Sequence, residues 1–329
     1  MKRFLAATLT LAVCAGLPLA HAEAQTKLRL LSSWNKNNWP TYAPIDYFQK
    51  VVNANPNPKI EITIFGEEVV PPFEQLQPAK SGVFDMLYTH GVYHAGSKGI
   101  ALVVDAIGHD VDKRRDSGVW KFVDEYYQRH NNLKMISMIS ASNHGYHIFL
   151  KEPLTPQNDW QGRKIRGTQS YHGVIKALGG APVVLPGGQI YTSLEKGVID
   201  GAAWPAAGML SMKHYEVAKY RVRPTFGVST EIVMVNLDKW KKLPADVQKT
   251  LLDLGYKLEK DWPAKGDEIQ KQEDDELHKL GVKDVMLPKD KIDLVNKVWA
   301  DSLWEVADQC CGDGSKELRQ LAIKAGLTQ

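Results

Sequence analysis

The sequence is poor in cysteine and has no strong excess of charge of either sign. Its 329 residues include three cysteines, Cys14 and the adjacent pair Cys310-Cys311. Two neighbouring cysteines cannot easily ligate one tetrahedral ion and no second cluster exists, which argues against a zinc site. The formal net charge at pH 7 is +3 and becomes +1 without Lys2 and Arg3. Domains that bind nucleic acids carry strongly basic patches, so no nucleic-acid partner is expected.

Long hydrophobic runs are also missing. A helix needs about 20 apolar residues to span a bilayer, and the best candidate, from Phe4 to about Leu19, is shorter. This run follows Lys2 and Arg3 and ends at Ala20-His21-Ala22. A positive start, a short apolar core and a small-residue cleavage site are typical of a secretory signal peptide. We therefore expect residues 1–24 to be removed, and the mature chain to act outside the cytoplasm without spanning the membrane.

A retained anchor helix and a lipid anchor on Cys14 are alternatives for the same segment. Val13 is bulky where a lipoprotein cleavage box needs a small residue, which disfavours the lipid anchor. In an oxidising compartment, Cys310 and Cys311 could close a vicinal disulfide or stay as two thiols near a loop. We expect a structural role for the pair.

Standard catalytic motifs are absent as well. Gly-Val-Ser at 227–229 is followed by Thr and Glu, so it is no nucleophile elbow. The sequence contains no His-Glu-x-x-His, no P-loop and no dinucleotide-binding glycine pattern. His90 and His94 could share a helix face as metal ligands, and His144 and His147 lie in another loop, but neither segment has a nearby Cys or carboxylate partner. We expect polar pocket lining from His90, and neither a metal nor a cofactor.

The first half of the mature chain alternates between strand and helix patterns. Apolar residues alternate with polar ones in Lys59–Phe65, as in a half-buried strand, and recur at helical spacing through Ile45, Phe48 and Val52. Such alternation predicts an α/β fold, in which helices cover a sheet and ligands bind at the carboxyl ends of the strands. The loops after the first three expected strands contain Trp34, Glu67, Glu68, His90, Tyr93 and His94.

A second α/β unit is expected after Ser140, with its last strand at 198–201. The stretch Glu231–Leu237 is strongly β-prone and could carry the chain back into the first unit. Apolar residues then recur every three or four positions from Val247 to about His278. A helix of some 30 residues is about 45 Å long and could run across two domains, although Pro263 could kink or end it.

Three stretches resemble the core pattern of one known family. They are Asp159 to Gly167 with its Lys-Ile-Arg strand, Leu178 to Pro186 with Gly-Gly-Ala-Pro, and Gln189 to Gly201, which ends in Gly-Val-Ile-Asp-Gly. Together they are similar to the solute-binding subunits of tripartite ATP-independent periplasmic (TRAP) transporters, the DctP-like family. Pro72-Phe73-Glu74, Ser81-Gly82 and Asp85-Met86 extend the resemblance over almost all of the mature chain.

The resemblance implies a two-lobed periplasmic binding protein fold with a hinge and a long helix spanning both lobes. It divides the chain into residues 25–143 plus 232–271 as lobe I and residues 144–231 plus 272–329 as lobe II. By the same resemblance, this chain would reside in the periplasm, capture a small organic acid and deliver it to the transporter's membrane subunits.

Arg166 matches the arginine that binds the ligand carboxylate in the family. A planar guanidinium fits a carboxylate, and a closed, dry cleft strengthens the pair. The alternative for Arg166 is a surface strand residue in a local salt bridge. Trp204 would form a pocket wall, with core packing as its alternative. The same comparison suggests ligand contacts for Asn143 and Tyr93, and we expect the loop aromatics Trp34 and Phe226 to line the cleft.

Two positions depart from the family pattern. Ala203 stands where some 2-oxo-acid-binding members place a glutamate that helps to hold a metal, so no metal is predicted. Gln189 stands where glutamate is common. A single dedicated arginine suits a monocarboxylate such as a 2-oxo, hydroxy or aromatic acid. A ligand sensor that docks on a receptor, and an exported hydrolase or lyase with His90, His94 or His147 as base, are the alternative functions.

Overall fold

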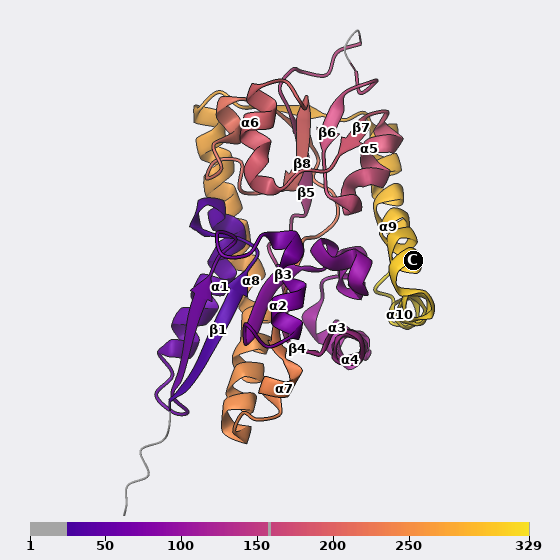
Figure 1. Ribbon diagram of the computed structural model, residues 1–329. Coiled ribbons are helices and arrows are strands. Elements are labelled where there is room, and N and C mark those ends of the chain that lie inside the picture. Colours follow the sequence, from indigo (N-terminus) through magenta and orange to yellow (C-terminus); the bar gives the residue numbers. More distant parts are fainter. Residues whose placement is uncertain (1–24, 157–158, 329) are drawn as a thin grey trace, which may run out of the picture.

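The computed structural model describes residues 25–156 and 159–328, which form two β-sheets with helices on their faces (Figure 1). The expected signal peptide and Cys14 lie outside these residues. The first sheet has the strand order β2-β1-β3-β10-β4. Its strands are β1 (Thr26–Ser32), β2 (Ile60–Phe65), β3 (Met86–His90), β4 (Leu133–Ser140) and β10 (Thr230–Asn236). We call this sheet with its covering helices the first lobe.

The second sheet has the order β11-β9-β5-β8-β6-β7 and belongs to the second lobe. Its strands are β5 (Tyr146–Leu150), β6 (Lys164–Arg166), β7 (Ala181–Val183), β8 (Gly201–Pro205), β9 (Tyr220–Arg223) and β11 (Lys283–Met286). The strand expected at 198–201 was placed too early, because Gly197 adopts φ 68 in a turn and Val198 is half exposed. The strand begins only at Gly201, where the chain pairs with β5.

The helices cover both faces of the first sheet, so β3 and β10 are buried throughout. The shorter helices are α1 (Trp39–Asn53), α2 (Leu76–Lys80), α3 (Val111–Asp116), α4 (Val119–Asn131), α5 (His172–Leu178), α6 (Ile190–Glu195) and α7 (Leu237–Trp240). The helix expected around Ile45, Phe48 and Val52 is α1, and all three side chains are buried in it. No helix within residues 25–156 and 159–328 is long and apolar enough to cross a membrane.

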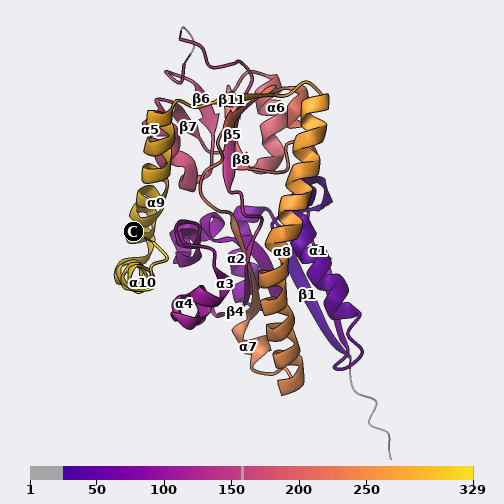
Figure 2. The ribbon, with the colours of Figure 1, turned by 180° about the vertical axis from the view of Figure 1, so that it is seen from behind.

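The long helix predicted from the sequence is α8 (Ala245–Lys279), which has 35 residues and continues through Pro263 (Figure 2). Its first half packs on β4 and α1, where Ser137 Oγ donates to Gly255 O at 2.9 Å. Its second half reaches the second lobe, where Glu273 accepts from the backbone N–H of Gly208 at 2.8 Å. The helix therefore connects the two lobes, as the resemblance implies.

Two chain crossings accompany α8 between the lobes, at residues 141–145 and 224–229. Glycine is required where they meet, because a Cβ on Gly145 would lie 2.1 Å from Gly227 O. A Cβ on Gly266 of α8 would likewise lie 1.8 Å from Ala141 O. Gly145 and Gly266 therefore let the two crossing segments and the helix come into backbone contact.

The C-terminal helices return to the first lobe. Helix α9 (Lys289–Cys311) packs on α5 and on the 3₁₀ turn at Ile100–Ala106, and α10 (Asp313–Lys324) packs on α4. The sequence-based division assigned residues 272–329 as a whole to the second lobe, whereas the contacts of α10 lie with the first.

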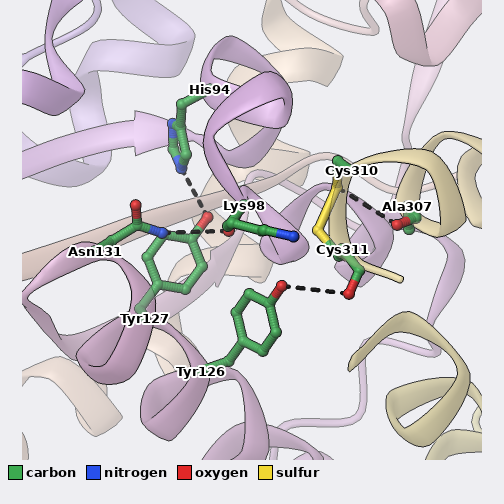
Figure 3. Close-up of a disulfide and its surroundings, with 8 residues drawn as sticks. All are labelled: His94, Lys98, Tyr126, Tyr127, Asn131, Ala307, Cys310 and Cys311. Atoms are coloured by element: carbon green, nitrogen blue, oxygen red, sulfur yellow. Dashed lines mark hydrogen bonds between the residues drawn. A yellow bond between two sulfur atoms is a disulfide. The ribbon is translucent and has the colours of Figure 1, made fainter. Parts of the chain in front are cut away.

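Cys310 and Cys311 form a disulfide at the end of α9 (Figure 3). Of the two states left open from the sequence, the structure has the disulfide. It lies next to α4, where Tyr126 Oη donates to Cys311 O at 3.5 Å. The pair therefore lies in the contact between the C-terminal helices and the first lobe, away from the region between the lobes where strands of both sheets end.

Candidate functional site

A small cavity lies between the lobes, where β1, β3, β6 and β8 end. The volume of this cavity is about 30 Å³. Sheets of this kind place ligands at the carboxyl ends of their strands. The first lobe contributes Trp34, Asn38, Thr41, His90, Tyr93, Ser229 and Glu231, and the second contributes Tyr146, Arg166, Thr168, Ser170, Tyr171 and Trp204.

Arg166 is the cationic side chain of this lining. It ends the short strand β6, is only 2% exposed, and donates to two backbone carbonyls, Leu185 O at 3.0 Å and Ala203 O at 3.3 Å. Its guanidinium also lies 5.3 Å from the ring centre of Trp204. These contacts fix the plane of the guanidinium without neutralising its charge.

No carboxylate among the described residues forms an ion pair with Arg166. Burial lowers the pKa of Arg166, and the neighbouring Tyr93 and Tyr171 oppose that shift. A guanidinium nevertheless stays protonated in proteins. A buried, oriented and unpaired cation is suited to bind an anion, and a planar carboxylate matches it best.

Aromatic rings form the walls of the cavity. Trp34 and Tyr93 have ring centres 5.7 Å apart on the first-lobe side, and Tyr146 and Tyr171 lie 5.1 Å apart on the second-lobe side. Gly187 leaves room for the Trp204 ring, since a Cβ at that position would lie 2.9 Å from it. The walls therefore suit a ligand with a small apolar or aromatic body.

His90 is part of a buried hydrogen-bond network centred on Asp105. Asp105 accepts from Tyr146 Oη at 2.5 Å, from the Thr230 backbone N–H at 2.9 Å and from His90 Nε2 at 2.9 Å. The other ring nitrogen, Nδ1, accepts from the Val92 backbone N–H at 3.2 Å. Both nitrogens of His90 are therefore engaged, and we assign the neutral ring with its proton on Nε2.

Glu231 is a further acidic member of the lining. It is 1% exposed, and its Oε1 accepts from Ser229 Oγ at 2.8 Å. Burial raises the pKa of Glu231 to about 7. A positive charge on His90 would oppose this shift, as the hydrogen bond from the Ser229 hydroxyl does. Reasoning from the sequence missed this residue. The available signal was an acidic residue directly before the four apolar residues 232–235 of a strongly β-prone stretch.

Five of the seven predicted ligand-contacting residues lie together in this cavity: Trp34, His90, Tyr93, Arg166 and Trp204. The alternative of a surface position for Arg166 does not match its burial. Trp204 lines the cavity and also packs in the hydrophobic core of the second lobe, so its two interpretations both hold. Tyr146, Tyr171, Thr168 and Ser170 were not predicted.

Asn143 and Phe226 do not line the cavity. Asn143 is exposed and bonds to Asp267 of α8, from its backbone N–H at 2.8 Å and from Nδ2 at 2.5 Å. Phe226 packs against Trp299 of α9 at 5.3 Å between ring centres. Each residue lies at the crossing between the lobes, where its contacts are with α8 or α9 instead of the cavity.

The remaining histidines named from the sequence are also elsewhere. His94 bonds to Tyr127 Oη at 2.7 Å, and burial lowers its pKa to about 3 (Figure 3). His147 accepts at Nδ1 from Arg223 at 2.8 Å. In the part of the chain that the structure describes, no group of three or more His, Cys, Asp or Glu residues is placed to hold a metal. Ala203 contributes its carbonyl to Arg166.

Comparison with known proteins identifies the family. The family model described as bacterial extracellular solute-binding protein family 7, DctP, matches residues 31–292. The chain belongs to this family. The resemblance to DctP-like solute-binding subunits of TRAP transporters is thus confirmed. The 2-oxoacid-binding periplasmic protein of Nostoc sp. is 24% identical over 257 residues, which cover 74% of this chain and 67% of that protein.

Solved structures confirm the two-lobed fold of this DctP-family protein. A TRAP solute-binding protein from Bordetella bronchiseptica, with copurified calcium and picolinate, is 21% identical and gives a TM-score of 0.78 over 92% of this chain and 91% of that one. One from Desulfovibrio salexigens with bound orotic acid is 20% identical and gives 0.76 over 91% and 98%. At this identity the likeness establishes the fold alone.

Proposed function

We propose that this DctP-family protein is exported to the periplasm, captures a small organic acid and delivers it to the membrane subunits of a TRAP transporter. The observation that carries the proposal is the buried guanidinium of Arg166, oriented by two carbonyls and unpaired among the described residues. An acid carboxylate would neutralise it in a site from which water is largely excluded, where paired hydrogen bonds are strong.

The ligand class follows from the rest of the lining. Arg166 is the single cationic residue that lines the described cavity, which suits one carboxylate better than two. The small cavity and its aromatic walls favour a 2-oxo, hydroxy or aromatic monocarboxylate. The Nostoc relative is described as binding monocarboxylate 2-oxoacids, and the two structural relatives hold orotic acid and picolinate, which are aromatic acids.

The contacts of His90 argue against the alternative of a hydrolase or lyase. A general base needs a nitrogen lone pair that can reach the substrate. In His90, Nδ1 already accepts from a backbone N–H and Nε2 donates to Asp105. His94 and His147 lie outside the cavity.

The proposal is tested by thermal-shift measurements on the mature protein with panels of monocarboxylates, dicarboxylates, aromatic acids and sugar acids. A ligand at 100 times its Kd adds about 2.7 kcal/mol to the free energy of unfolding. We expect a large shift with small monocarboxylates, which Arg166→Gln abolishes and Asn143→Ala leaves in place. Circular dichroism establishes that each variant is folded. A shift that survives in Arg166→Gln, or no shift with any acid, would contradict the proposal.

A further inference from the structure

The buried carboxyl groups of Glu231 and Glu273 differ in how completely they are hydrogen-bonded. Burial raises the pKa of both Glu231 and Glu273 to about 7. Both carboxyl oxygens of Glu273 accept from backbone N–H groups of the loop that begins at Gly208. In Glu231, Oε1 accepts from the Ser229 hydroxyl, whereas Oε2 has no hydrogen-bond partner among the described residues. A buried polar atom without a partner calls for a physical reason, and Glu231 lines the cavity.

The histidine opposite Glu231 does not supply a balancing charge. Glu231 on β10 is directly opposite His90 on β3 in the antiparallel register. The Asp105 carboxylate raises the pKa of His90 against the effect of burial. A doubly protonated ring, however, would turn Nδ1 into a donor that faces the Val92 N–H, 3.2 Å away. The neutral ring satisfies both contacts.

The surroundings of the other charged and titratable groups near Glu231 indicate that Glu231 is the group that takes up a proton. Asp105 accepts from three donors, so both of its carboxyl oxygens are occupied as acceptors. Burial raises the pKa values of Tyr88, Tyr93 and Tyr171, which stay neutral. Arg166 lines the same cavity. Glu67 contributes to the raised pKa of Tyr93. When an acid neutralises Arg166, an ionised Glu231 would be an uncompensated buried charge.

We propose that Glu231 is the second recognition group for the acid, a neutral carboxyl whose Oε2–H donates to an oxygen beside the ligand carboxylate. This inference rests on the proposed function and names its ligand class more closely. The site would prefer 2-oxo and 2-hydroxy acids over the plain carboxylic acid of the same skeleton. When Glu231 starts ionised, binding takes up one proton from solvent, which ends on Oε2.

Calorimetric titration with two sets of acids tests the preference. Pyruvate, lactate and propionate differ only at C2, and so do phenylpyruvate, phenyllactate and 3-phenylpropionate. We expect the oxo or hydroxy member to bind at least about tenfold more tightly at pH 6, since an unmet buried donor costs about that much. Above pH 7, the affinity should fall toward tenfold per pH unit, with proton uptake shown by titrations in two buffers of different ionisation enthalpy.

Two variants separate a neutral donor from an ionised acceptor. In Glu231→Gln, Ser229 Oγ donates to the amide oxygen, so the amide N–H₂ takes the place of Oε2–H. We expect this variant to lose the pH dependence above pH 7 while it still prefers the oxo or hydroxy acid. Glu231→Ala should lose that preference, because propionate and 3-phenylpropionate then leave no buried donor unmet.

The opposite results would overturn the inference. A loss of binding by Glu231→Gln at every pH would show that Glu231 acts as an ionised acceptor. Binding that needs Arg166 but is independent of pH and of Glu231 would overturn this inference and leave the proposed function standing. No binding by any of the six acids would overturn this inference, and the absence of a thermal shift with every acid of the wider panels would overturn the proposed function too. Infrared spectra without ligand add a direct check. The protonated-carboxyl band near neutral pH should shrink in Glu231→Gln, beyond the loss seen in Glu273→Gln, and an unchanged band would contradict the assignment.

Discussion

His214 is a buried histidine that supports the cavity from behind Trp204. Its ring stacks on Phe149 at 5.1 Å and meets Trp204 edge-on at 5.4 Å. Neither ring nitrogen has a hydrogen-bond partner among the described residues. Burial, with a smaller effect from the Arg166 charge, lowers the pKa of His214 to about 3. The ring is therefore neutral in the folded protein and packs as an aromatic.

This residue predicts acid sensitivity. Because the unfolded chain has a histidine pKa of about 6.5, it binds protons more tightly, and the free energy of unfolding falls as the pH drops from 6.5 toward 3. His214→Phe should remove up to about 1.4 kcal/mol of that loss per pH unit. Urea unfolding at pH 7, 6, 5 and 4 measures the slope, with the exposed His144→Phe as control. An unchanged slope in His214→Phe would refute the assignment.

At the same scale, sequence reasoning found the residues whose chemistry is visible in a motif. Arg166 was found because it ends the Lys-Ile-Arg strand, and Trp204 because it follows Asp200-Gly201. Glu231 and Tyr171 were missed because their place in the cavity depends on which lobe packs opposite them. Asn143 was assigned to the ligand because sequence does not show that Asp267 of α8 lies beside it.

At the scale of elements, glycine determines how closely α8 approaches the crossing between the lobes. Alanine at position 266 would bring a Cβ to 1.8 Å from Ala141 O, a backbone atom. Overpacking costs about 1–3 kcal/mol, more than the gain of up to about 1 kcal/mol from helix propensity. Gly266→Ala should therefore lower the free energy of unfolding, whereas Gly188→Ala, which meets nothing within 4 Å, should be nearly neutral. Chemical denaturation compares the two, and equal stabilities would contradict the close approach.

The helices and strands with strong apolar periodicity were predictable from the sequence, whereas the contacts of the segments that cross between the lobes were not. The 35-residue α8 was found because its apolar residues repeat along the whole segment. The start of β8 was misplaced because a turn at Gly197 has no periodic signal. The return of α10 to the first lobe was missed because an amphipathic pattern shows that a face is buried without showing what buries it.

At the scale of the whole molecule, the cavity is enclosed by both lobes. Its lining is largely buried, with Arg166 at 2% and Glu231 at 1% exposure. Because Arg166 is so deeply buried between the lobes, we expect the lobes to separate when an acid enters and to close around it. Small-angle X-ray scattering should therefore give a larger radius of gyration without acid than with a saturating acid ligand. Arg166→Gln should show no compaction. An identical radius in both states of the native protein would argue against hinge closure.

Because α10 returns to the first lobe, both ends of the described chain lie in that lobe. Thr26 begins a strand of the first sheet, and Leu327 O accepts from the Gly108 backbone N–H at 2.6 Å, also in that lobe. A surface tether or a fused fluorophore at either end would therefore be attached to the first lobe and leave the second lobe free to move. Immobilised biosensors made from this chain should keep their response, but a pair of dyes at the two ends would move together and report nothing of closure.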